Sequence, residues 1–224
     1  MSDPDGRADV LARIRAANQR AGVSGPAVPM VPRDYAATGE HAAGSDEAVD
    51  LLEDRLVDYR ASVSRCYDAG VADAVRAALG HAARRVVVPP GLPPEWVGDA
   101  GTGGAVEWVV DDGTLTPEQL DEMDAVVTAA SAAAAVTGTI VLDGSPDQGR
   151  RAISLVPDVH VCVVRAEQVV HSVPELLARL EPTRPTTFIS GPSATSDIEL
   201  ERVEGVHGPR TLHVVLVVEP DTAA

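Results

Sequence analysis

Short valine-rich runs with little polar alternation are the feature that most restricts the fold of this chain. They are separated in several places by segments with helical periodicity. Nearly continuous apolar strands are typical of sheets covered on both faces, so we predict an α/β fold with a largely parallel sheet flanked by helices. The predicted strands are 84–89, 106–110, 124–128, 139–142, 159–164, 186–189 and 212–218.

Helical patterns supply the layers that cover this sheet. The segment 129–136 is rich in alanine, and we expect it to form a buried helix. A Thr-Pro start indicates a helix at 116–122. The complete set of predicted helices in this part of the chain is 47–67, 71–79, 93–97, 116–122, 129–136 and 173–180.

The N-terminal region differs from the rest of the chain. Residues 9–20 predict a weak amphipathic helix that ends at Gly22, and residues 22–46 are rich in Gly, Pro and Ala. We therefore divide the chain into an N-terminal helix and linker, 1–46, and an α/β domain, 47–224. A detached helix of this kind is typical of a docking or dimerisation arm.

Composition excludes several classes of partner and location. The formal net charge is −16, so the surface would repel nucleic acid and anionic membranes. The longest uncharged run, 126–142, contains hydroxyl residues and glycine and is short for a membrane span. The N-terminus shows no cationic region followed by an apolar segment. We expect a cytoplasmic protein with no membrane span.

The basic residues and cysteines restrict the chemistry. All 18 basic residues are arginine, which excludes a Schiff-base lysine, covalently held pyridoxal phosphate and a P-loop lysine. The two cysteines, Cys66 and Cys162, match no metal spacing and are too few to hold an iron–sulfur cluster alone. We expect two reduced core thiols and no bound cofactor.

The segment 188–209 is the strongest candidate for a site, because its glycines and prolines fix backbone directions that ordinary loops leave free. Ser196 and Glu199 match a capping box and predict a short helix that closes at 204–205. Its serines and backbone N–H groups suit a small anion. A purely structural turn explains the same residues.

Two residues of this segment are candidates for acid–base chemistry. Asp197 suits a general base, or a carboxylate that orients His207; alternatively it only complements the helix dipole. His207 is flanked by glycines that let a ligand approach its ring, although a structural histidine has the same pattern. The predicted ligand-binding residues are Thr137, Gly138, Thr139, Ser190, Gly191, Ser193, Thr195, Gly205 and Gly208.

Further polar residues lie in other loops and strands. Arg150 and Arg151 follow a glycine turn, where they could clamp a carboxylate or phosphate, or lie on a solvated hairpin. His160 and His213 lie within valine-rich strands and are expected to be hydrogen-bonded core histidines. Because ligands bind beyond the carboxyl ends of parallel strands, we expect loops 142–152 and 189–197 to meet there.

Four motifs occur in one order: Thr137-Gly-Thr139, Ser154-Leu-Val-Pro157 with Val159-His-Val, Gly191-Pro-Ser-Ala-Thr-Ser-Asp-Ile198, and Gly205-Val-His-Gly-Pro209. Together they resemble the LUD-domain family, the LutC/YkgG-like lactate utilization group, from about Glu47 to Val218. At two positions the chain departs from the family pattern. Val136 replaces a glutamate and Ala194 replaces an arginine, so the expected pocket has one acid and one cation fewer.

The resemblance implies a fold similar to the NagB/RpiA/CoA-transferase superfamily and a role in oxidising L-lactate to pyruvate. It further implies two partner subunits, at least one of which carries iron–sulfur clusters. On this hypothesis the chain is a non-redox subunit that binds a small carboxylate, iron–sulfur partner subunits, or both.

Two alternatives remain open at this point. The chain could be a stand-alone isomerase or acyl/CoA-transferase-like enzyme acting on a phosphorylated or CoA-linked molecule, with Asp197 and His207 as its acid–base pair. It could also be an assembly or regulatory module with a vestigial pocket. Whether the chain is catalytic is not decided by the sequence.

Overall fold

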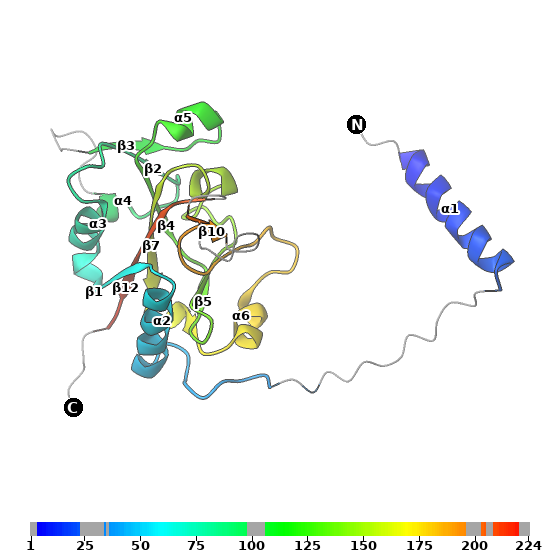
Figure 1. Ribbon diagram of the computed structural model, residues 1–224, viewed down its shortest axis with the longest axis horizontal. Coiled ribbons are helices and arrows are strands. Elements are labelled where there is room, and N and C mark those ends of the chain that lie inside the picture. Colours follow the sequence, from blue (N-terminus) through cyan, green and yellow to red (C-terminus); the bar gives the residue numbers. More distant parts are fainter. Residues whose placement is uncertain are drawn as a thin grey trace. The chain divides into compact units, whose positions relative to one another are not determined.

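The computed structural model describes residues 4–22, 34, 36–97, 106–195, 203–204 and 208–219 (Figure 1). The chain divides between Tyr35 and Ala36 into two units. In the first unit, α1 (Pro4–Arg20) confirms the predicted N-terminal helix, which ends in a turn at Ala21–Gly22. Its apolar residues Val10, Leu11 and Ile14 are exposed.

The second unit is built on a six-stranded sheet in which all pairings are parallel, which confirms the predicted α/β architecture (Figure 1). The strand order is β1-β12-β7-β4-β2-β3. Their bounds are β1 (Ser62–Cys66), β2 (Arg85–Val88), β3 (Glu107–Val110), β4 (Ala125–Ala129), β7 (Val159–Arg165) and β12 (Thr211–Val217).

Helices and a second sheet cover the two faces of this sheet, because successive strand residues point to opposite sides. In β7, Val161 and Val163 pack with α3 (Val71–Leu79) and α4 (Pro94–Val97). The alternate residues Cys162 and Val164 pack with α2 (Asp46–Asp58) and the second sheet. The short helix α5 (Pro117–Asp121) covers Val87 and Val126 on this second face.

The second sheet has the order β8-β5-β6-β9, with antiparallel pairing of β5 with β6 and of β6 with β9. Its strands are β5 (Ala132–Ala134), β6 (Thr139–Leu142), β8 (Val169–Val170) and β9 (Thr187–Ile189). Helix α6 (Val173–Arg179) contacts β5 and β8. The prediction of a helix over 129–136 is therefore wrong. Its three central alanines are fully buried and pair with strands on both sides, so tertiary packing overrides alanine's helix propensity.

The predicted helix over 47–67 is also too long. Helix α2 ends at Asp58, and Arg60 then adopts a left-handed conformation with φ of 68°. The chain reverses at this point and forms β1, which pairs with β12. A non-glycine residue in this region breaks the helical path, and the pattern of apolar residues gave no sign of it.

The predicted helix that begins at Ser196 is contradicted at its end. Val203–Glu204 form β11, which pairs antiparallel with β10 (Ala194–Thr195). Residues 196–202 lie outside the described part of the chain. A helix that closes at 204–205 is thus replaced, in its last residues, by a two-stranded ladder.

Both cysteines are free, and they lie on opposite faces of the central sheet. Burial raises the pKa of the Cys162 thiol to about 12. Burial is also the largest cause of the raised pKa of the half-buried Cys66 thiol.

The two thiols should differ in reactivity, because the thiolate is the reactive form. We expect a chromogenic thiol reagent to label Cys66 slowly in the native protein and Cys162 only after unfolding. A Cys162→Ala control should leave the native signal unchanged. Equal labelling of both native thiols would contradict this arrangement.

Candidate functional site

Three predicted hydroxyl residues form one hydrogen-bonded chain. Thr139 Oγ1 lies 2.8 Å from Thr137 Oγ1 and 2.8 Å from Ser190 Oγ. Antiparallel pairing of β6 with β9 causes this, because it places the start of β6 beside the residue that follows β9. The Thr-Gly-Thr motif and the Ser190 loop, which are distant in sequence, are therefore neighbours. Both were predicted to bind one ligand, and this requires them to lie close together.

Four of the predicted ligand-binding residues line one cavity of about 260 Å³, which we call the hydroxyl cavity. They are Ser190, Gly191, Ser193 and Gly208, and the same lining includes Arg151, Ser154 and His160. A hydrogen bond of 2.9 Å from the Ser193 amide to the Pro209 carbonyl joins the two loops. The structure thus brings the Gly-Pro-Ser loop and the loop before β12 together.

The remaining predicted residues are placed differently. Gly138 has φ of 56°, and a Cβ there would lie 2.9 Å from Arg55 Cβ, so this glycine allows the turn to pack on α2. Thr195 lies in β10. Asp197, Gly205 and His207 lie outside the described residues, so their convergence with Ser193 stays a prediction.

His160 forms part of the lining of the hydroxyl cavity although it is almost fully buried. Its Nε2 lies 2.8 Å from Thr128 Oγ1, which confirms the prediction of a hydrogen-bonded core histidine. Burial lowers its pKa to about 4, so the ring is neutral at physiological pH. His213 is half-buried with Nε2 3.0 Å from Ser64 Oγ, and burial lowers its pKa as well.

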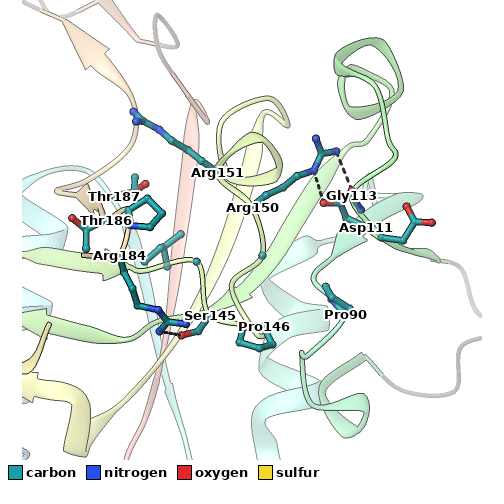
Figure 2. A pocket seen from close by; sticks show the side chains of 15 residues that line it. Pro90, Asp111, Gly113, Ser145, Pro146, Arg150, Arg151, Arg184, Thr186 and Thr187 are labelled. Atoms are coloured by element: carbon teal, nitrogen blue, oxygen red, sulfur yellow. Dashed lines mark hydrogen bonds and ion pairs between the residues drawn. The ribbon is translucent and has the colours of Figure 1, made fainter. Parts of the chain in front are cut away.

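A larger cavity of about 760 Å³, the arginine cavity, lies at the carboxyl ends of β2 and β3 (Figure 2). Pro90 and Asp111, which follow these two strands, line one side of it. The loop after β6 and the segment before β9 line the rest, and together they contribute Arg150, Arg151 and Arg184. Three arginines thus surround one cavity of a strongly acidic protein.

Two of these arginines are held by carboxylates, Arg150 by Asp111 of the same cavity and Arg184 by Asp143. Arg150 Nε donates to Asp111 Oδ2 at 2.7 Å and its Nη2 to Asp111 Oδ1 at 3.0 Å, and hydrogen bonding to Asp111 raises the pKa of Arg150 (Figure 2). Arg184 Nη1 donates to Asp143 Oδ2 at 2.9 Å. Burial opposes ionisation of Asp143, but hydrogen bonds from Ser145 and the charge of Arg184 keep its pKa below the usual value.

The pair of Asp111 and Arg150 gives a direct test of this geometry. Asp111 is only 4% exposed, and we expect Asp111→Asn to destabilise the fold by about 2 kcal/mol, because a buried charged hydrogen-bond acceptor is lost. Thermal unfolding should show a melting temperature lower by several degrees. The neighbouring Asp112, which is exposed and bonds Thr114, provides the control, and Asp112→Asn should leave the melting temperature almost unchanged. Equal losses in the two variants would contradict a buried clamp at Asp111.

The expectation that loops 142–152 and 189–197 meet at the carboxyl edge is only half correct. The first loop does lie there, beside Pro90 and Asp111. Ser190 to Ser193 instead lie beside His160 and Leu212, near the amino ends of β7 and β12. The reason is that β9 runs antiparallel to β6, so their following loops leave at opposite ends. Arg151 and Thr187 line both cavities and connect the two regions.

Comparison with known proteins decides the family. The model of the LUD domain matches residues 99–217. A protein named Lactate utilization protein C from Deinococcus radiodurans is 47% identical over 175 residues, which cover 76% of this chain and 80% of that protein. The chain belongs to the LUD domain family. This confirms the resemblance inferred from the four ordered motifs.

Other LUD-family relatives agree with this placement. Lactate utilization protein C of Bacillus subtilis is 26% identical over 77% of this chain and 79% of its own length. YkgG of Escherichia coli is 31% identical over 51% of this chain and 52% of its own length. A crystal structure of a DUF162 family protein from Deinococcus radiodurans superimposes with a TM-score of 0.64 and 40% identity, covering 76% of this chain and 96% of that one.

Two kinds of feature are absent from the described residues. Every helix there is too short or too polar to cross a bilayer. No group of three or more His, Cys, Asp and Glu side chains in the same part of the chain is placed to hold a metal ion.

Proposed function

We propose that this LUD-family protein is a non-redox subunit of an L-lactate utilization system, in which lactate is oxidised to pyruvate beside iron–sulfur partner subunits. The observation that carries the proposal is the 47% identity, over three quarters of the chain, to a protein named Lactate utilization protein C. Identity at this level over most of a domain supports a shared role more strongly than a shared fold alone does.

The cysteines support the assignment of electron transfer to a partner. An iron–sulfur cluster usually takes four thiolates, whereas this chain has two cysteines, and these lie on opposite faces of a sheet. Cys162 is in addition fully buried with a strongly raised pKa, so it is a poor ligand. A cluster that serves the reaction therefore belongs to another chain.

We assign the small carboxylate to the hydroxyl cavity. Its volume of about 260 Å³ accommodates a three-carbon hydroxy acid, and Ser190 and Ser193 supply hydroxyl groups at one wall. His160 of the same lining is neutral, so binding of the carboxylate there depends on hydrogen-bond donors and not on a histidine charge. Hydroxyl and amide donors of this kind orient a carboxylate without a metal ion.

Titration of the full chain with L-lactate and pyruvate tests the carboxylate assignment. We expect Ser190→Ala to weaken binding severalfold, since it removes a hydroxyl from the cavity wall. Ser62→Ala, on the exposed part of β1, is the matched control and should bind as the wild type does. No binding of either acid, or equal binding by both variants, would refute this placement.

Co-purification tests the partner assignment. Tagged full-length protein, recovered from its native host grown on L-lactate, should bring down partner chains together with iron and acid-labile sulfide. The same purification from cells grown without lactate serves as the control for chance association. Recovery of the bare chain from lactate-grown cells would contradict the proposal.

A further inference from the structure

We propose that the arginine cavity binds an organic anion larger than lactate, with its oxyanion head on Arg151 and its apolar body between the prolines of the cavity wall. The shared chemistry of the head is a carboxylate or a phosphate. This second site goes beyond the proposed role as a lactate-utilization subunit and does not depend on it.

Arg151 differs from the other two arginines of the cavity in its partners. Arg150 and Arg184 are paired with Asp111 and Asp143, so their charges are largely compensated. Within the part of the chain that the structure describes, no carboxylate pairs with the guanidinium of Arg151. Five N–H donors in a planar fork are therefore available to an oxyanion that has two acceptor oxygens.

The backbone that carries Arg151 is held firmly on both sides. Arg150, the preceding residue, is clamped by Asp111 and also donates to the Leu115 carbonyl at 2.6 Å. Gly149 has φ of 71°, and a Cβ there would lie 2.7 Å from Ile153 Cδ1 and 3.0 Å from Pro89 Cβ. Arg151 itself opens a 3-10 turn, Arg151–Ser154. Because the backbone is already fixed, no backbone entropy is lost when Arg151 binds a ligand.

The wall of the cavity is preformed. The Gly91 amide donates to the Pro146 carbonyl at 2.8 Å, and a Cβ on Gly91 would lie 2.5 Å from Pro146 Cβ, so these two loops are in close contact. Pro90, Pro146 and Pro185 add rigid apolar surface to the lining. A volume of about 760 Å³, in which apolar wall surface lies beside charged and hydroxyl side chains, is typical of a site for an organic ligand. Lactate alone would leave most of it filled with water.

Charge sets the orientation of the ligand. Figure 2 shows Asp111 at one side of the cavity and Arg151 at the other, on the side of Thr186 and Thr187, and Asp112 follows Asp111 in the lining. Arg151 and Thr187 both also line the hydroxyl cavity, which Asp111 and Asp112 do not. The carboxylate of Asp112 is bonded to Thr114 and, among the described residues, to no arginine, so it repels an oxyanion. The head therefore lies at Arg151, and the body extends toward Pro90 and Pro146.

Calorimetric titration at physiological salt tests the proposal with two large probes, phenylpyruvate for a carboxylate head and ADP for a phosphate head. Acetate and inorganic phosphate serve as probes with a head and almost no body. We expect one large probe to bind more tightly than its small counterpart. Arg151→Gln should weaken that binding at least about tenfold, because a charge-assisted bidentate pair is lost.

The matched control is Arg210→Gln. It removes an arginine that forms an ion pair with Asp158, and both side chains of this pair are exposed to solvent. It should leave the affinity unchanged, and both variants should melt as the wild type does. Binding of phenylpyruvate alone identifies a carboxylate ligand, and binding of ADP alone a phosphate ligand. Failure of both probes, or equal affinity in wild type and Arg151→Gln, would overturn the proposal. Either result would leave the co-purification test of the proposed function unaffected.

Discussion

Gly191→Ala is expected to destabilise the protein by about 3 to 4 kcal/mol, more than we expect from Asp111→Asn. Gly191 has φ of 86°, a conformation that strains any residue with a Cβ. It is also buried, and a Cβ there would lie 2.7 Å from Tyr59 Cβ and 2.9 Å from the Tyr59 carbonyl oxygen. Either the turn after α2 or the loop of the hydroxyl cavity must move to make room.

Gly113→Ala is the matched control for this substitution. Gly113 has nearly the same φ, 90°, but a Cβ there would meet no atom within 4 Å. Its cost should be only the backbone strain, about 1 kcal/mol. Chemical denaturation of the two variants separates strain from close packing. Equal losses of unfolding free energy would show that Gly191 does not pack against Tyr59 as described.

The second large effect is a loss of stability with falling pH that comes from His160. The ring is buried, and burial lowers its pKa from 6.5 to about 4 in the folded state. Below pH 6.5 the unfolded chain therefore binds a proton that the folded chain does not. The contribution of His160 to the free energy of unfolding is fully present above pH 6.5. It is lost as the pH falls from 6.5 to about 4, and the loss amounts to about 3 kcal/mol.

Unfolding measured between pH 7 and pH 4 tests this contribution. His160→Gln should lower stability at pH 7, since it removes a fully buried ring, but its remaining stability should depend less steeply on pH than that of the wild type. His81→Gln, at an exposed position, should keep the slope of the wild type. A His160→Gln variant with an unchanged slope would assign the acid sensitivity to other groups.

The strands of the central sheet could be predicted from the sequence because a strand that is buried on both faces requires a run of apolar residues, such as the valines of β2. Two errors arose where local preference and tertiary context disagree. The alanines of β5 favour a helix in isolation but are enclosed between strands, where small side chains are required. The end of α2 depends on the backbone of Arg60, which no periodic pattern reveals.

The candidate site was predicted in part for a similar reason. The hydroxyl residues Thr139 and Ser190 lie in motifs with unusual composition, and the structure joins them. The position of Asp111 could also have been predicted from the sequence, because an acidic residue directly after a strand lies at the carboxyl edge of the sheet. There it pairs with Arg150. No sequence pattern predicts the role of Arg184, because its partner Asp143 is distant in sequence. The antiparallel pairing of β9 with β6 brings the two residues together.

Growth on L-lactate tests the central claim most directly. The native host should be deleted for this chain, complemented with the wild type, and grown on L-lactate or pyruvate as the sole carbon source. The deletion strain should fail on L-lactate, grow normally on pyruvate, and regain growth on L-lactate with the wild-type chain. Undiminished growth of the deletion strain on L-lactate would contradict a role in lactate utilization.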